Sequence, residues 1–212
     1  MNRYFMTGTD TGVGKTFVTA ALASLARSLG QRVLAWKPIE TGCVGLGEDQ
    51  RELIEAAGGW QTGALAGVYQ FDLAAAPLVS ARAVGAEIDV AKLEAVYRAA
   101  PDVDLSLVEG AGGWRVPITE SLDMGGFAKR LGLPVILVAR AGLGTINHSL
   151  LSIEAIEREG CELAGVVLSR RPEDDPAFAD SNRDEIQRRW AGRVIVLDTD
   201  PAILTPFVSR GT

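Results

Sequence analysis

The chain has 212 residues with a formal charge of −6, one histidine and two cysteines, and 47% of its residues are hydrophobic. This length and hydrophobic content are typical of one folded domain and exclude a disordered chain, while two cysteines and one histidine offer neither a disulfide framework nor a zinc cluster. Because acidic residues outnumber basic ones, we expect no nucleic-acid partner. Because no signal peptide and no run of roughly 20 apolar residues is found, we expect a cytoplasmic protein without a membrane partner.

Short apolar or β-branched runs alternate with stretches of helical period. The runs that predict strands are residues 3–7, 32–37, 105–109, 135–139, 165–169 and 194–197. The stretches that predict helices are residues 15–29, 50–57, 90–99, 125–131, 146–159 and 178–190. This alternation is typical of βαβ units, so we expect one α/β domain over residues 1–212, with a doubly wound, mostly parallel sheet covered by helices on both faces. Residues 64–86 give no clear prediction, and residues 170–184 suit an exposed loop that leads into a helix.

The first predicted strand and helix are joined by Gly8-Thr9-Asp10-Thr11-Gly12-Val13-Gly14-Lys15-Thr16. This pattern predicts a phosphate-binding loop, in which backbone N–H groups surround an anion, Lys15 reaches the outer phosphates and Thr16 binds Mg²⁺. The usual spacing has glycine at position 9, where this chain has Thr9. A glycine-rich turn that only caps a helix would not need Gly-Lys-Thr. A dinucleotide-binding fingerprint fails because Phe17 replaces its third glycine.

Ligands of doubly wound sheets bind beyond the carboxyl ends of the strands, so the residues that follow the other strands are also candidates. The run Lys37-Pro38-Ile39-Glu40-Thr41-Gly42 follows the second strand, and its lysine would place a second cation over a transferring phosphate or a carboxylated substrate. Taken alone, this residue is equally well a surface lysine. Glu48-Asp49 precedes a predicted helix and could supply a magnesium carboxylate or cap the helix.

Two further strand ends carry glycine-rich runs. Glu109 ends a predicted strand and leads into Gly110-Ala111-Gly112-Gly113-Trp114. This is the position where nucleotide-hydrolysing folds keep a metal-side carboxylate, and the glycines allow close approach of backbone to a ligand; we expect Trp114 to pack in the core. The run Gly142-Leu143-Gly144-Thr145-Ile146-Asn147 opens a helix, and its free N–H groups would bind a carboxylate.

Together with Pro134-Val135-Ile136-Leu137-Val138, these motifs resemble the dethiobiotin synthase family of biotin biosynthesis, a group of P-loop NTPases. The matches spread from residue 3 to about residue 168. The resemblance implies a homodimer that uses Mg²⁺ and ATP to close a ring. In this reaction 7,8-diaminononanoate takes up CO₂ as a carbamate, the γ-phosphate of ATP moves to the carbamate, and the second amine displaces phosphate to give dethiobiotin.

The resemblance also implies a role for individual residues. The catalytic set is Lys37, Lys15 and Thr11. The nucleotide-binding set is Asp10, Thr11, Gly12, Val13, Gly14, Lys15, Thr16, Phe17, Glu109 and Ser169. The set that binds the diamine or its carbamate is Thr11, Lys37 and Thr41, together with amides that the partner subunit presents at Gly144, Thr145, Ile146 and Asn147. The magnesium set is Thr16, Asp49 and Glu109.

Three departures from the family leave details open. Gly12 replaces an acidic residue of some members, and Ser169-Arg170 stand where others carry an adenine-reading Asn, so the base preference is not predicted. The connection before Asp49 is shorter than in some members, so Glu48 remains an alternative metal ligand.

Two other classes of protein share this type of loop. A partition-type ATPase usually has an additional lysine where this chain has Asp10, and it often carries a basic or amphipathic surface. An amidotransferase-linked synthetase needs a downstream glutaminase domain, for which 212 residues leave no room. We therefore expect neither.

Overall fold

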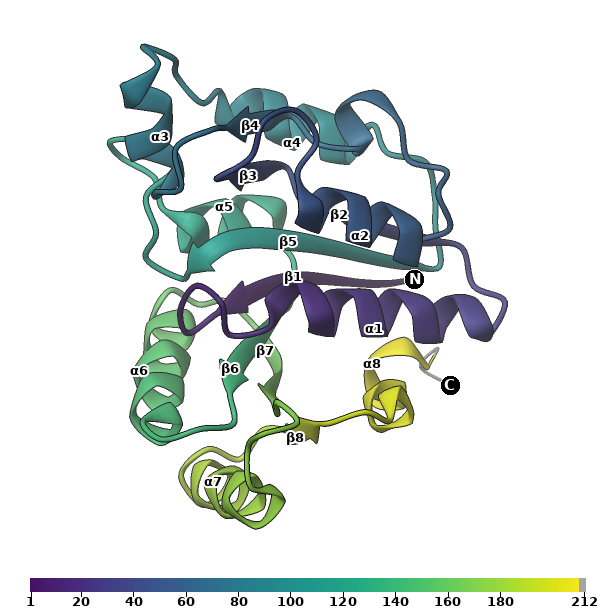
Figure 1. Ribbon diagram of the computed structural model, residues 1–212, viewed down its shortest axis with the longest axis vertical. Helices are drawn as coiled ribbons and strands as arrows, with labels where there is room; N and C mark the ends of the chain where they lie inside the picture. Colours follow the sequence, from purple (N-terminus) through teal and green to yellow (C-terminus); the bar gives the residue numbers. More distant parts are fainter. Residues whose placement is uncertain (210–212) are drawn as a thin grey trace.

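The computed structural model describes residues 1–209 and arranges them around a six-stranded sheet of order β2-β5-β1-β6-β7-β8 (Figure 1). The strands are β1 (Asn2–Gly8), β2 (Val33–Trp36), β5 (Leu105–Gly113), β6 (Val135–Arg140), β7 (Leu163–Ser169) and β8 (Val194–Leu197). Every pairing in this sheet is parallel. The predicted sheet is therefore confirmed, while residues 210–212 of the predicted domain lie outside the described residues.

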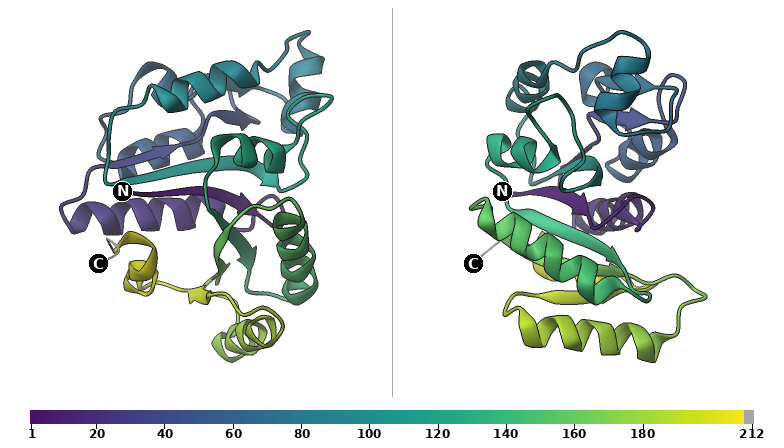
Figure 2. Two further views of the ribbon diagram at one scale, coloured as in Figure 1. Left: turned by 180° about the vertical axis from the view of Figure 1, so that it is seen from behind. Right: turned by 90° about the vertical axis from the view of Figure 1, so that its left-hand side faces the viewer.

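Successive side chains of each strand point to opposite faces of the sheet. In β1, Phe5 belongs to one buried core and Met6 to the other. The Met6 face is covered by α1 (Lys15–Ser28), α2 (Glu48–Ala56) and α8 (Thr205–Val208). The Phe5 face is covered by α4 (Val90–Arg98), α5 (Met124–Leu131), α6 (Thr145–Arg158) and α7 (Pro176–Arg189). Figure 2 shows helices on both sides of the sheet, as a doubly wound fold requires.

A second, two-stranded sheet begins shortly after β2 and contacts β5, and its second strand lies in residues 64–86, for which no clear prediction was made from the sequence. It pairs β3 (Ile39–Thr41) with β4 (Tyr69–Phe71), and α3 (Pro77–Ala83) packs nearby. A 3₁₀ helix, Gly63–Leu65, precedes β4, and another, Pro201–Leu204, precedes α8. The two strands of this sheet have only three residues each, too few to show a hydrophobic period, which explains why they were not predicted.

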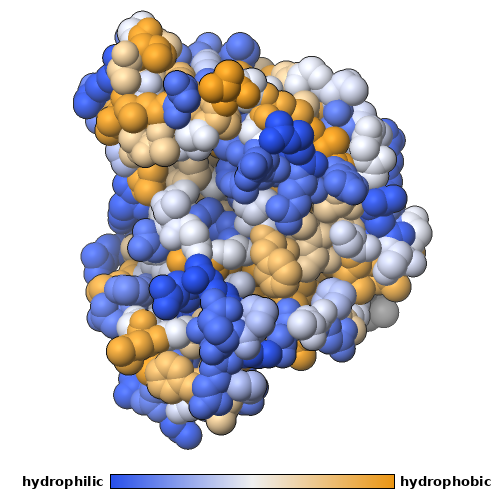
Figure 3. Space-filling model, viewed as in Figure 1, coloured by the Kyte–Doolittle hydropathy of each residue, from blue (hydrophilic) through white to orange (hydrophobic). Residues whose placement is uncertain are grey.

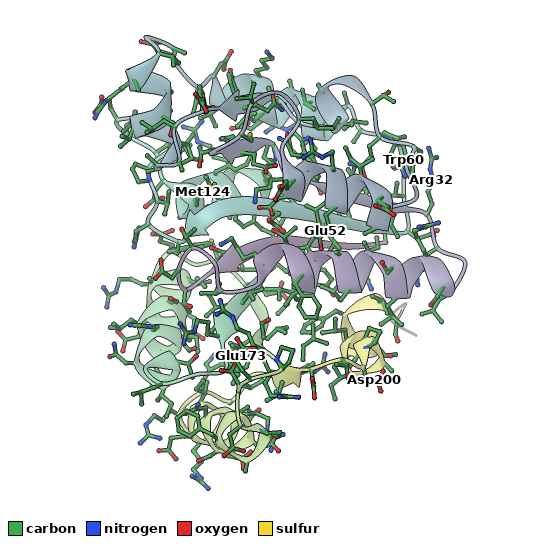
Figure 4. All side chains as sticks on the ribbon, in the orientation of Figure 1. Arg32, Glu52, Trp60, Met124, Glu173 and Asp200 are labelled. Carbon is green, nitrogen blue, oxygen red and sulfur yellow. The ribbon has the colours of Figure 1, made fainter. Side chains whose placement is uncertain are left out.

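The connection between α2 and β4 is anchored at the amino-terminal end of β2. Trp60 Nε1 donates to the carbonyl oxygen of Val33 at 2.9 Å, and the Arg32 guanidinium lies 5.0 Å from the centroid of the Trp60 ring. Figure 4 shows Arg32 and Trp60 together at one side of the molecule, away from the carboxyl end of β1. This anchor fixes one end of β2, whereas Lys37 follows the other.

Three predicted boundaries were wrong in ways that affect the site. The strand β5 continues to Gly113, so the glycine run after Glu109 belongs to the strand rather than to a loop. Helix α2 begins at Glu48, so the carboxylate pair forms its first turn instead of preceding it. Helix α7 begins at Pro176, so much of the predicted loop 170–184 is helical. Proline is common at the first position of a helix and here marks its start.

Among the helices of residues 1–209, none is long and apolar enough to cross a membrane.

Candidate active site

The phosphate loop joins β1 directly to α1. Gly12 and Gly14 adopt φ angles of 71° and 95°, a left-handed conformation that favours glycine. A Cβ atom at Gly14 would lie 2.4 Å from Oγ of Ser169, so glycine also permits the close approach of the loop to β7. Because the free N–H groups and the positive end of the helix dipole meet here, the start of α1 is suited to bind an anion.

A cavity of about 590 Å³ lies at the carboxyl ends of β1, β2 and β5, in front of the phosphate loop. In the space-filling view of Figure 3 the molecule is hollowed on its left side, between the parts that carry α3 and α6. Nine of the predicted site residues line the cavity, namely Thr11, Gly12, Gly14, Lys15, Thr16, Phe17, Lys37, Thr41 and Asp49. Segments from three separate regions of the sequence therefore converge at one place.

A buried charged cluster forms the floor of this cavity. Lys37 Nζ donates to Oε1 of Glu109 at 2.9 Å and also forms an ion pair with Asp49. Glu109 is fully buried, and it accepts further hydrogen bonds from Thr16 Oγ1 at 2.9 Å and Thr19 Oγ1 at 2.7 Å. Buried charges are stable only when they are paired and hydrogen-bonded, as they are here. The alternative of a solvated surface lysine at position 37 is thereby excluded, since Lys37 is 7% exposed.

The two lysines of the site have opposite pKa shifts. Burial by itself lowers the pKa of Lys37, but Glu109 and Asp49 raise this pKa above its ordinary value. The pKa of Lys15 is lowered, chiefly by burial. The Glu109 carboxylate raises this pKa, but by less than burial lowers it. Lys15 Nζ donates to the carbonyl oxygen of Asp10 at 3.1 Å, and it forms no ion pair among residues 1–209. An incoming anion would therefore stabilise Lys15 most directly.

The oxygen atoms of this cluster fit a magnesium ion. Thr16 offers a hydroxyl group and Glu109 and Asp49 offer carboxylates, which are the hard oxygen ligands that Mg²⁺ prefers. Within the described chain, no group of three or more His, Cys, Asp or Glu residues could hold a metal by itself. Mg²⁺ in nucleotide sites needs only one or two carboxylates, because phosphates and water complete its shell.

The structure distinguishes Asp49 from Glu48. Asp49 meets Lys37 at the cavity, whereas the side chain of Glu48, one residue earlier in α2, is exposed. This geometry favours Asp49 as the second carboxylate of the cluster.

Ser169 lies in a second cavity of about 260 Å³ on the other side of Gly14. Phe17 lines both cavities, and Arg170 and Arg171 line the second one. Arg171 Nη2 donates to the carbonyl oxygen of Gly12 at 3.2 Å, while Arg170 forms an ion pair with Asp198. The segment after β7 is thus attached to the phosphate loop.

Other predicted residues lie outside the main cavity. Asp10 is exposed, and its Oδ1 accepts from the backbone N–H of Thr11 at 2.7 Å; Val13 is buried in the core. The residues from Gly144 to Asn147 form the start of α6, where Gly144 has φ 89°. Thr145 is buried and Ile146 half-buried, while Gly144 and Asn147 are exposed, and none of the four lines the 590 Å³ cavity.

Several residues of the site were not predicted from the sequence. Thr19 lies one helical turn after Lys15, so its spacing could have indicated that both face β5. Glu40 stood in the Lys37 motif without an assigned role, yet it lines the cavity and is 7% exposed. Residues 74–77 also line the cavity, and no sequence pattern indicated this.

Comparison with known proteins adds independent information. A family model described as an AAA domain matches residues 2–196. The ATP-dependent dethiobiotin synthetase BioD of Anaeromyxobacter dehalogenans strain 2CP-C is 46% identical over 191 residues, which cover 89% of this chain and 85% of that protein. The protein of the same name from Anaeromyxobacter sp. strain K is 45% identical over 180 residues, covering 84% and 81%.

Among solved structures, the cell division ATPase MinD of Pyrococcus furiosus is similar with a TM-score of 0.55 and 20% identity, covering 98% of this chain and 88% of that one. The similarity to this solved structure concerns the fold alone.

Proposed function

Because the chain belongs to the family of ATP-dependent dethiobiotin synthetases, we propose that its cavity forms the cyclic urea of dethiobiotin from 7,8-diaminononanoate, CO₂ and ATP. It is an ATP-dependent ligase of biotin biosynthesis. The observation that carries the proposal for the site is the buried Lys37, held between Glu109 and Asp49 beside the phosphate loop. A cation in this position suits a reaction in which two anions, the carbamate and the triphosphate, must meet.

Different residues of the cavity bind the phosphates, the carbamate and the diamine. The amides from Gly12 to Thr16 and the Lys15 ammonium hold the phosphates, while Lys37 contacts the carbamate oxygen that attacks the γ-phosphorus. The leaving ADP oxygen takes the electrons of the broken P–O bond. The second amine then attacks the carbonyl carbon, loses its proton and expels phosphate. Thr11 and Thr41 line the cavity and would orient the diamine or its carbamate.

Thr16, Asp49 and Glu109 would hold a magnesium ion. When bound, the ion neutralises charge on the β- and γ-phosphates. Before nucleotide enters, Thr16, Thr19 and Lys37 keep the Glu109 carboxylate in one orientation through three hydrogen bonds.

We propose that the active protein is a homodimer. The amides from Gly144 to Asn147 stand at a helix N-terminus, a favourable place for the carboxylate tail of the substrate. Their position outside the cavity of their own chain supports the interpretation that they serve the cavity of the partner subunit.

The 260 Å³ cavity is the candidate site for the nucleotide base. It adjoins Gly14 and contains Ser169, Arg170 and the exposed ring of Phe17. No side-chain amide is among its lining residues, so we propose that the base is held without an adenine-specific contact.

Two further proposals concern the domain organisation and the cellular location of the whole chain. We propose that residues 1–212 act as one domain, which agrees with the single six-stranded sheet that β1, β2, β5, β6, β7 and β8 form. ATP and the other small, polar substrates support a cytoplasmic location.

The test is a ring-closure assay. Purified protein is incubated with diaminononanoate, bicarbonate, Mg²⁺ and ATP, and dethiobiotin is measured by mass spectrometry together with released phosphate. We expect one phosphate per dethiobiotin and no product when either the diamine or ATP is omitted. ATP hydrolysis that is independent of the diamine, with no cyclic product, would instead support the partition-type ATPase alternative.

A further inference from the structure

Glu40 joins the small sheet to the first turn of α2. It lies in β3, is 7% exposed, and lines the main cavity. Its Oε1 accepts from the backbone N–H of Asp49 at 3.1 Å, and its Oε2 accepts from that of Gln50 at 2.9 Å. The N-cap residue of α2 is Gly47, which has no side chain to satisfy these donors. Glu40 therefore caps α2 from a different element, and its negative charge faces the positive end of the helix.

The fit around Glu40 is tight. A Cβ atom at Gly47 would lie 1.9 Å from the Glu40 carboxyl carbon, so any other residue there would displace this carboxylate. Gln50, in the same helical turn, donates through Nε2 to the carbonyl oxygen of Lys37 at 3.0 Å. The first turn of α2 is thus fixed both to β3 and to Lys37, which directly follows β2.

The chemistry of the cavity makes this arrangement informative. A free carboxylate would repel the anions that the cavity is proposed to receive, but both oxygens of Glu40 are engaged by helix N–H groups. Those N–H groups belong to the turn that holds Asp49 against Lys37. The position of the Asp49 side chain relative to Lys37 and Glu109 consequently depends on Glu40.

We propose that Glu40 is a positioning residue of the active site, which fixes the first turn of α2 so that Asp49 meets Lys37 and the magnesium position. This role differs from that of the predicted binding residues, since both carboxylate oxygens of Glu40 accept from helix N–H groups and Glu40 acts through Asp49. The kinetic consequence rests on the proposed function, whereas the structural consequence does not.

The first experiment compares Glu40→Gln with a matched control, Glu48→Gln. Glutamine keeps the shape of Glu40 but loses its charge and turns an NH₂ group toward one of the two helix donors. The control removes an exposed carboxylate from the same helical turn. Hydrogen–deuterium exchange of metal-free protein is expected to be roughly 10-fold faster over residues 47–53 in Glu40→Gln, and unchanged in Glu48→Gln. Unchanged exchange in both variants would overturn the proposal.

The second experiment asks whether Glu40 acts through Asp49. In the ring-closure assay, Glu40→Gln is expected to raise the Mg²⁺ concentration for half-maximal rate by about 10- to 100-fold. Substitution of residues that orient a metal ligand usually weakens metal affinity by this amount. The KM for the diamine should change by less than about 2-fold. In an Asp49→Asn background, Glu40→Gln should add almost nothing, because residues that act as a unit are non-additive.

Two outcomes would contradict this role: a raised diamine KM with unchanged Mg²⁺ dependence, which indicates direct substrate contact, or fully additive losses in the double variant. If Glu40→Gln is too unstable to assay, Glu40→Asp retains the charge on a shorter side chain and is expected to show the same pattern with a smaller shift. Should the parent protein fail to form dethiobiotin, the exchange experiment still decides the positioning role, so the two failures are distinguishable.

Discussion

Two regions at the carboxyl edge of the sheet differ in how complete they are. Beneath the phosphate loop, Lys37, Glu109 and Asp49 already contact one another, and Glu109 is fully buried. At the start of α6, Gly144 and Asn147 are exposed and lie outside the cavity. The first region is assembled within one chain, whereas the second presents its donors to the outside.

The difference follows from the cost of burial. A buried carboxylate such as Glu109 must have its partners in the folded chain, because an unpaired charge in the interior costs several kcal/mol. At the start of α6 the Thr145 N–H donates to the Gly142 carbonyl oxygen at 3.3 Å, whereas Gly144 and Asn147 lie at the surface, where water can solvate their N–H groups until a ligand arrives. The groups proposed to meet the transferring phosphate are preorganised, and those proposed to select the substrate are left accessible.

The largest effect is expected from Lys37→Met, which removes the cation of the buried cluster. Loss of one preorganised charge at the reacting groups typically lowers kcat by about 100- to 1000-fold. The ring-closure assay measures this loss. The control is Lys129→Met, which removes an exposed lysine of α5 and should leave kcat unchanged. Circular dichroism must show that the variant is folded, because Glu109 loses a buried partner. Unchanged turnover in folded Lys37→Met would show that the cluster is only structural.

A smaller effect is expected from Asn147→Asp at the start of α6. The new carboxylate would repel the tail of the diamine, so its KM should rise by roughly 10-fold or more while kcat and the KM for ATP stay nearly constant. Steady-state kinetics with the diamine and ATP varied separately measure this pattern. A reduced kcat with unchanged diamine KM would argue against a tail-binding role.

Mixing the two variants tests whether the regions cooperate across subunits. In a dimer of Lys37→Met with Asn147→Asp, one of the two shared sites contains only native residues. Assayed at a diamine concentration below the native KM, an equal mixture that exchanges subunits should therefore reach about a quarter of native activity, above the mean of the two separate variants. If the α6 start served its own chain, or if the protein were a monomer, the mixture would show only that mean.

Local sequence patterns predict some features of the fold and of the site, whereas non-local contacts determine the others. The strands of the large sheet could be predicted because buried parallel strands are short, nearly continuous apolar runs, and most of the helices that cover it could be predicted from their helical period. The grouping of Lys15, Thr16 and Lys37 could be predicted because they follow strands of a doubly wound fold, whose carboxyl ends converge, and Glu109 joins them from the second half of β5.

Residues that act through non-local contacts escaped prediction. Glu40 caps α2 from a three-residue strand, and nothing in its own neighbourhood indicates that its partners are nine and ten residues further along. Residues 74–77 reach the cavity only through the packing of α3 and the small sheet. Such positions depend on the fold as a whole, and only the three-dimensional structure reveals them.

The smallest expected effect concerns the segment after β7, where Arg171 contacts the phosphate loop at the Gly12 carbonyl oxygen. Because no side-chain amide lines the adjoining cavity, we expect cytidine and guanosine triphosphates to support ring closure with kcat/KM within about 10-fold of ATP. Arg171→Ala should raise the KM of all three nucleotides by only about 2- to 5-fold, since the lost contact is a single exposed hydrogen bond. The matched control is Arg188→Ala, an exposed arginine near the end of α7. A strict requirement for ATP would mean that backbone groups of this segment read adenine, and the segment after β7 would then be as preorganised as the cluster of Lys37, Glu109 and Asp49.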